Sequence, residues 1–157
     1  MSTLSFLFIL AFAVLLAGAA FQDVRSRTIS NLWPLALILL FGIAFSLDVV
    51  KGGLGSHALH FVLALLAGFA LFAAGWFGGG DAKLYAAAAL WFTLGDALYL
   101  LLSVALVGAV LAIGHLVIMM TRKRADPARR KTLREAQLAY GVAIALGALV
   151  ALPRALA

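Results

Sequence analysis

Residues 97–120 have the sequence ALYLLLSVALVGAVLAIGHLVIMM, which contains no acidic residue, lysine or arginine. As an α-helix, this run is long enough to cross the roughly 30 Å hydrocarbon core of a membrane. Five further apolar runs lie at Leu4–Phe21, Leu32–Val50, His57–Phe77, Leu84–Leu94 and Ala136–Leu152. The run at Leu84–Leu94 is short, which indicates a tilted or partial span. The pattern predicts an all-α, polytopic membrane protein of about six transmembrane helices.

The composition supports the same fold class. Hydrophobic residues make up 66% of the 157 residues and charged residues 11%, and the mean hydropathy is +1.13. A soluble domain carries about 25% charged residues, so this chain has too few to cover a water-facing surface. At about 20 residues per span, six or at most seven helices use the whole length, and we expect a single transmembrane domain over residues 1–157. The chain has no cysteine, which excludes disulfides, thiolate catalysis and cysteine-ligated metal sites.

The basic residues are unevenly distributed among the predicted loops. Of the twelve lysines and arginines, seven lie between Arg122 and Arg134. With six spans, ten basic residues fall on the face that carries loops 22–31, 78–83 and 121–135, and two fall on the other face. Because lysine and arginine are enriched in cytoplasmic loops, we expect the first face to be cytoplasmic, both termini to lie outside, and the protein to cross the cytoplasmic (inner) membrane several times. In a membrane protein, a cluster of basic residues such as that between Arg122 and Arg134 usually fixes the orientation of the chain in the membrane. We therefore expect no nucleic-acid partner.

Two of the six acidic residues, Asp23 and Asp81, lie at the ends of apolar runs on different helices and at the same predicted membrane depth. A carboxylate at the membrane edge of a helix bundle is costly unless it faces protein or a water-filled cavity. Two carboxylates that lie close together share a proton, because both cannot ionise at short range. The ionised member can take a proton from water while the protonated member donates to a carbonyl oxygen. The placement is compatible with an aspartic-protease dyad, and two unrelated helix-end aspartates are the alternative.

Local motifs surround both aspartates. Residues 78–83 (GGGDAK) contain the pattern G-x-G-D-x-K, and residues 23–31 (DVRSRTISN) form the pattern D-x-R-x-R-x-I-x-N. Residues 140–147 (YGVAIALG) provide a third motif in the last apolar run. Together the three motifs resemble those of the type IV prepilin peptidases, the microbial membrane aspartic proteases with a GxGD motif. The resemblance implies that Asp23 and Asp81 are the catalytic pair.

The resemblance covers essentially the whole chain, with two departures. Ala139 and Ser30 stand where the family usually has proline, and these changes concern turn geometry rather than catalysis. The chain also lacks the paired CxxC motifs of larger members, which methylate the new N-terminus as well. It is similar to the short, peptidase-only form of tight-adherence (Flp-type) pilus systems. The implied activity is cleavage of the short basic leader from a prepilin at the cytoplasmic membrane surface, without a cofactor.

Five residues near the aspartates are expected to support geometry or substrate binding: Gly78, Gly80, Lys83, Asn31 and Arg25. The successive glycines leave the backbone bare, so we expect 78–81 to be a mobile segment that an extended peptide can approach. Lys83 either favours the singly ionised dyad or anchors its helix at the lipid headgroups. Asn31 either bonds across the 22–31 loop or caps the next helix, and capping is favoured. For Arg25 and Arg27, headgroup anchoring is favoured over substrate contact.

Other functions are compatible with the same residues. Asp23 and Asp81 could form the proton relay of a small proton-coupled transporter, or the chain could be a non-catalytic subunit of a pilus or secretion assembly. A transporter would place its carboxylates near the membrane midplane, often with inverted repeats, and the sequence shows neither. His57 and His60 lack a third ligand nearby, so no metal site is predicted. The implied partners are a prepilin and the lipid bilayer, and the sequence makes no prediction about oligomeric state.

Overall fold

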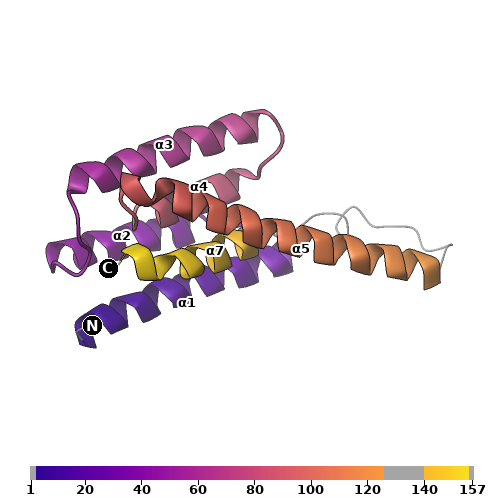
Figure 1. Cartoon of the computed structure of the whole chain (residues 1–157), viewed down its shortest axis with the longest axis horizontal. Helices are drawn as coiled ribbons and strands as arrows, with labels where there is room; N and C mark the ends of the chain where they lie inside the picture. Colours follow the sequence, from indigo (N-terminus) through magenta and orange to yellow (C-terminus); the bar gives the residue numbers. More distant parts are fainter. Residues whose placement is uncertain (1–2, 126–139, 156–157) are drawn as a thin grey trace.

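The computed structural model describes residues 3–125 and 140–155, and Figure 1 shows their arrangement. Within these ranges the chain is helical, without strands. The elements are α1 Thr3–Ser26, α2 Leu32–Ser46, α3 Leu54–Ala73, α4 Gly79–Ala89, the 3-10 helix η1 Leu94–Asp96, α5 Ala97–Ala125 and α7 Tyr140–Ala155. Each predicted apolar run corresponds to one α-helix, which confirms the all-α fold. Most of the predicted basic loop, together with Ala139, lies outside the described residues.

The helices differ in their capacity to cross a membrane. Three segments are long and apolar enough by length and composition: Thr3–Ser26, Leu54–Ala73 and Leu94–Thr121. α2 and α7 are shorter apolar helices. α4 has 11 residues, which at 1.5 Å per residue gives about half of the roughly 30 Å hydrocarbon thickness. The described chain thus contains the six expected helices, and three of them have membrane-crossing length.

The helices run antiparallel, so successive connections alternate between the two ends of the bundle (Figure 1). The start of α1 and the end of α7 lie at one end, and the α1–α2 and α3–α4 connections lie at the other. α4 packs against α2, α3 and α7, and α7 also packs against α1 and α5. The end of α1 and the start of α4 are therefore brought to the same end of the bundle.

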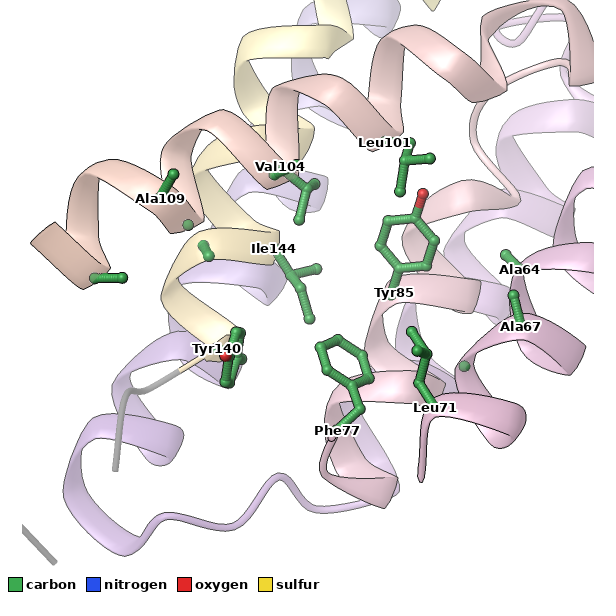
Figure 2. Close-up of a pocket in the computed structure, with 15 residues that line it drawn as sticks. Ala64, Ala67, Leu71, Phe77, Tyr85, Leu101, Val104, Ala109, Tyr140 and Ile144 are labelled. Carbon is green, nitrogen blue, oxygen red and sulfur yellow. The ribbon is translucent and has the colours of Figure 1, made fainter. Parts of the chain in front are cut away.

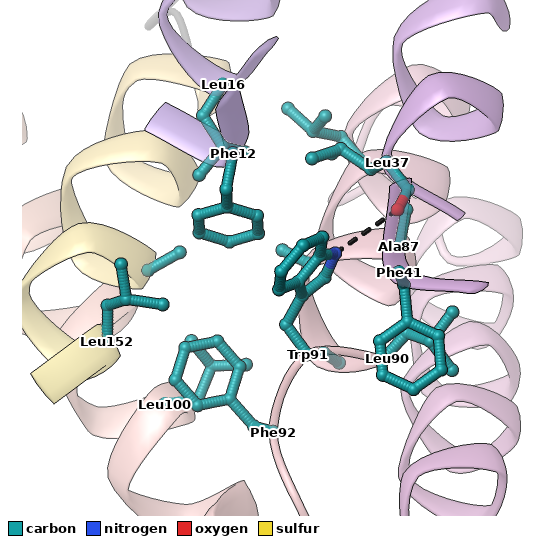
Figure 3. Packing of buried hydrophobic residues seen from close by; sticks show 14 of the residues in the cluster. Phe12, Leu16, Leu37, Phe41, Ala87, Leu90, Trp91, Phe92, Leu100 and Leu152 are labelled. Atoms are coloured by element: carbon teal, nitrogen blue, oxygen red, sulfur yellow. Dashed lines mark hydrogen bonds between the residues drawn. The ribbon is translucent and has the colours of Figure 1, made fainter. Parts of the chain in front are cut away.

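The core is centred on Trp91, which follows α4 and is 3% exposed (Figure 3). Its indole N–H donates to the carbonyl oxygen of Leu37 in α2 at 3.2 Å. Its ring packs against Phe12 of α1 and Phe41 of α2, with ring centroids 4.7 Å and 6.0 Å apart. Aromatic side chains bury large apolar areas, so this cluster fixes α1 and α2 against the segment that follows α4.

α4 ends at Ala89, although the predicted apolar run continues to Leu94. The backbone then forms turns before η1, which leaves carbonyl groups without helical partners. His57 Nδ1 lies 2.9 Å from the Leu90 carbonyl oxygen, and His60 Nδ1 lies 3.1 Å from that of Phe92. Because a carbonyl oxygen can only accept, His60 Nδ1 donates to Phe92. His57 Nε2 also lies 3.0 Å from the Lys51 carbonyl oxygen, and a neutral imidazole ring donates to one of its two carbonyl neighbours. Backbone N–H and C=O groups outside a helix need hydrogen-bond partners from the protein when they lie within a membrane bundle. The buried His57 and His60 of α3 lie at hydrogen-bond distance from two such carbonyl groups.

Candidate active site

Asp23 lies in the last turn of α1, beyond the end of the predicted apolar run at Phe21. The helix continues to Ser26, whose Oγ donates to the Gln22 carbonyl oxygen at 2.8 Å. The Asp23 side chain is buried, with 6% of its surface exposed. The prediction that a loop begins at residue 22 is therefore wrong, and Asp23 is held by a helix. A side chain on a helix is more precisely positioned than one on a loop.

The Asp23 carboxyl group lies at the N-terminus of α7. The N–H of Gly141 donates to Asp23 Oδ2 at 2.8 Å. The first N–H groups of a helix have no partner within it, and the helix dipole favours negative charge at this end. A Cβ on Gly141 would lie 2.9 Å from Asp23 Oδ2 and 3.1 Å from Ile29 Cδ1, so only glycine fits without displacement. The 140–147 motif thus supplies a backbone donor to Asp23.

Asp81 lies in the first turn of α4. Gly78 is the N-cap residue, with φ −75° and ψ 144°, so Asp81 is the third helical residue. The N–H of Gly78 hydrogen-bonds to the Asp81 carboxyl group, as in the second half of a capping box. A Cβ on Gly78 would lie 2.5 Å from Asp81 Oδ2, which explains the need for glycine. The segment 78–81, expected to be a loop, is helical from Gly79 onward.

Asp23 and Asp81 line one cavity of about 280 Å³. Its other lining residues are Arg27, Thr28, Ile29, Gly78, Gly79 and Gly80. Burial and, secondly, the charge of Asp23 raise the pKa of Asp81 from 3.8 to about 6, against the opposite effect of the Gly78 hydrogen bond. Asp81 Oδ1 is buried and has no hydrogen-bond partner within the described ranges. The two carboxyl groups are therefore electrostatically coupled, and Asp81 binds its proton more tightly than an ordinary aspartate.

Another wall of the cavity is the connection between α1 and α2. Gln22 Oε1 accepts from Trp33 Nε1 at 2.6 Å and from the Ser30 N–H at 3.2 Å, and these bonds hold the connection against α1. A Cβ on Gly80 would lie 3.0 Å from Ile29 Cβ. Gly80 does not have a positive φ, so its role is steric: it lets α4 approach the connection closely.

Three of the predicted supporting residues lie outside this cavity. Lys83 Nζ donates to Asn31 Oδ1 at 3.0 Å on the exposed surface. Asn31 precedes α2 but makes no side-chain capping bond, so the capping prediction is wrong; its side chain links the α1–α2 connection to α4. Arg25 lines a separate hollow between α1 and α2, together with Gln22 and Trp33.

Arg27 lines the cavity with the two aspartates, although the sequence interpretation placed it at the lipid headgroups. Its Nη1 is buried and has no hydrogen-bond partner in the part of the chain that the structure describes. The D-x-R-x-R pattern places two arginines close to Asp23 but does not distinguish them, and the structure places Arg27 directly after the end of α1. Arg25 and Arg27 therefore have different surroundings.

An apolar groove of about 440 Å³ lies between α3, α4, α5 and α7 (Figure 2). Most of its lining is small or aliphatic, including Ala64, Ala67, Val104, Ala109 and Ile144. Phe77 and Tyr140 also line it, with ring centroids 5.5 Å apart. Each of these aromatic residues directly precedes a glycine of the site, Gly78 or Gly141. The groove is thus adjacent to the cavity that holds the aspartates.

Comparison with protein-family models matches residues 9–113 to the type IV leader peptidase family. The matched region extends from α1 into α5, so it includes both aspartates and every other residue that lines their cavity, and it ends before α7. Searches of curated proteins and of solved structures return no significant match.

Proposed function

The chain belongs to the type IV leader peptidase family, and on this basis we propose that it is a membrane aspartic endopeptidase that acts through Asp23 and Asp81. The observation that carries the proposal is the shared cavity, which carboxyl groups from α1 and α4 line together. An aspartic protease needs one carboxyl group as a base and a second as an acid. The surroundings of the two aspartates differ in the way that these two roles require.

In the proposed reaction Asp81 is the acid and Asp23 is the base. Asp23 takes a proton from a water molecule, whose oxygen attacks the carbonyl carbon of the scissile bond, and Asp81 gives its proton to the carbonyl oxygen. The neutral diol then collapses: the C–N bond breaks, Asp23 returns its proton to the leaving nitrogen, and a diol hydroxyl returns one to Asp81. The raised pKa of Asp81 supports its assignment. The Gly141 N–H supports that of Asp23, because it holds Oδ2 as an acceptor.

The proposed substrate is a prepilin, with a short basic leader followed by a long apolar helix. The groove beside the cavity supports this choice, because it is apolar and lined largely by small side chains. Small residues let a second helix approach closely within a membrane. In this proposal the apolar helix of the substrate lies along the groove and the scissile bond reaches the aspartates. The lack of cysteine favours the peptidase-only, Flp-type form.

We propose that the site faces the cytoplasm from the inner membrane. Arg25, Arg27 and Lys83 lie at the site end of the bundle, and Lys51 lies in the α2–α3 connection at the opposite end. Basic residues are enriched on the cytoplasmic side of membrane proteins. Reporter fusions near residue 26 should therefore report a cytoplasmic location and those near residue 54 an external one. The reverse pattern would exclude cleavage on the cytoplasmic side.

The direct test is to incubate the purified protein with a candidate prepilin in lipid vesicles and to measure leader release by mass spectrometry. Asp23→Asn and Asp81→Asn should each lower the rate by about 10²- to 10⁴-fold, because the dyad needs both an acid and a base. Asp48→Asn is the matched control, since Asp48 is exposed and its ion pair with Lys51, at 2.8 Å, is also on the surface. Wild-type cleavage by either dyad variant would refute the proposed mechanism.

A further inference from the structure

Arg27 occupies a backbone position that favours glycine. It directly follows α1 with φ 58°, in the left-handed region, and its N–H donates to the Asp23 carbonyl oxygen at 2.8 Å. Helices commonly end with a residue in this conformation, but that residue is usually glycine or asparagine, because a longer side chain is strained there. Glycine would therefore serve the capping role better, and the Arg27 side chain calls for a separate explanation.

The position of the Arg27 side chain provides one. Arg27 lines the cavity of the two aspartates, and its buried Nη1 has no hydrogen-bond partner among the described residues. A guanidinium group stays charged in proteins and carries five N–H donors. Leaving a buried donor unpaired is costly, so such a group in a native structure needs an explanation, and a catalytic role is one of them. A cation in this cavity is complementary to a substrate oxygen that gains negative charge.

We propose that Arg27 is a third catalytic residue, whose guanidinium group donates a hydrogen bond to the oxygen of the scissile carbonyl group. The inference rests on the proposed endopeptidase function. As water attacks the carbonyl carbon, negative charge develops on that oxygen while the proton of Asp81 is being transferred. A donor held in place beforehand stabilises this transition state more than the ground state. The bond from the Arg27 N–H to the Asp23 carbonyl oxygen fixes the arginine backbone relative to the base.

The chain offers a matched control for this role. Arg25 has the same side chain two residues earlier, but it lines the separate hollow between α1 and α2 rather than the dyad cavity. Both arginines lie at the same end of the bundle, so a general effect of positive charge on membrane orientation or substrate attraction should be similar for the two. The two arginines differ in that Arg27 lines the cavity and has a left-handed backbone conformation, and the Arg27→Gly variant separates these two differences.

The test compares Arg27→Gly and Arg27→Gln with Arg25→Gln, measuring kcat and KM on one prepilin and thermal unfolding of each variant. Arg27→Gly removes the guanidinium group and relieves the strained φ, so its unfolding temperature should be unchanged or higher. Its kcat should fall about 10²- to 10³-fold with KM changed less than about threefold. Added guanidinium ion should restore part of the kcat of Arg27→Gly, an effect that a structural role would not produce. Arg25→Gln should retain wild-type kcat.

Several outcomes would overturn the proposal. One is wild-type kcat in a folded Arg27→Gly or Arg27→Gln variant. A second is an increase in KM with unchanged kcat, which would indicate ground-state binding of another part of the substrate. The third is unfolding of both variants, which would show a structural role. Asp81→Asn is assayed in parallel. If it cleaves the prepilin, the dyad mechanism itself fails; if it is inactive and the Arg27 variants are not, only the role of Arg27 fails.

Discussion

Replacing Gly141 by alanine changes the surroundings of Asp23 without altering an ionisable group. The added Cβ would lie 2.9 Å from Asp23 Oδ2 and 3.0 Å from Asp23 Cβ, which is closer than van der Waals contact allows. Either α7 or the carboxyl group must move, and the 2.8 Å bond from the Gly141 N–H then lengthens or breaks. A misplacement of a catalytic group by about 1 Å can cost up to roughly 100-fold in rate. Displacing the base should therefore lower kcat roughly 10- to 100-fold.

The assay is leader release from a purified prepilin under saturating substrate, with thermal unfolding measured in parallel. Gly114→Ala is the control, because a Cβ on Gly114 meets nothing within 4 Å; its cleavage and stability should match the wild type. A folded Gly141→Ala variant with wild-type kcat would refute the reasoning, since it would show that the α7 N–H does not position the base.

Three further perturbations address other parts of the site. Because the pKa of Asp81 is raised to about 6, the protonated fraction of Asp81 falls as the pH rises through that value. The ratio kcat/KM, measured between about pH 5 and 8, should therefore decrease on the alkaline side. A ratio that rises steadily with pH would contradict the role of Asp81 as the acid. Gly80→Val adds a branched side chain where a Cβ already lies 3.0 Å from Ile29 Cβ, so turnover should fall at least about tenfold. Gly79→Ala is its control, because its Cβ would make an ordinary contact of 3.4 Å, and equal turnover in both variants would indicate that close packing at Gly80 is unimportant. Lys83→Met removes an exposed hydrogen bond outside the cavity and should change kcat less than about threefold, so a much larger loss would indicate a direct effect on the dyad.

The existence of the helices is predictable from the sequence, but their ends near the site are not. The apolar run that begins at Leu4 ends at Phe21, yet α1 continues to Ser26, because main-chain hydrogen bonds do not require apolar side chains. Three successive glycines predict a loop before Asp81. The helix nevertheless begins at Gly79, where the Asp81 carboxyl group bonds back to the Gly78 N–H and α4 packs against α2, α3 and α7.

By itself the sequence determines that this chain is a helical membrane protein and that two aspartates end apolar segments within specific motifs. Hydrophobicity and short motifs are local properties, so they can be identified without knowing which helices meet. Only the tertiary structure decides that the Gly141 N–H donates to Asp23, 118 positions away in the sequence. It also decides that Arg27 rather than Arg25 lines the cavity of the two aspartates. Helix α2 and residues 97–120 of α5 are apolar on every side, and their side-chain periodicity does not indicate which face turns inward. The contact between Gly141 and Asp23 depends on the packing of α7 on α1, and Arg27 adopts a left-handed conformation directly after α1. Neither feature can be read from local hydrophobicity.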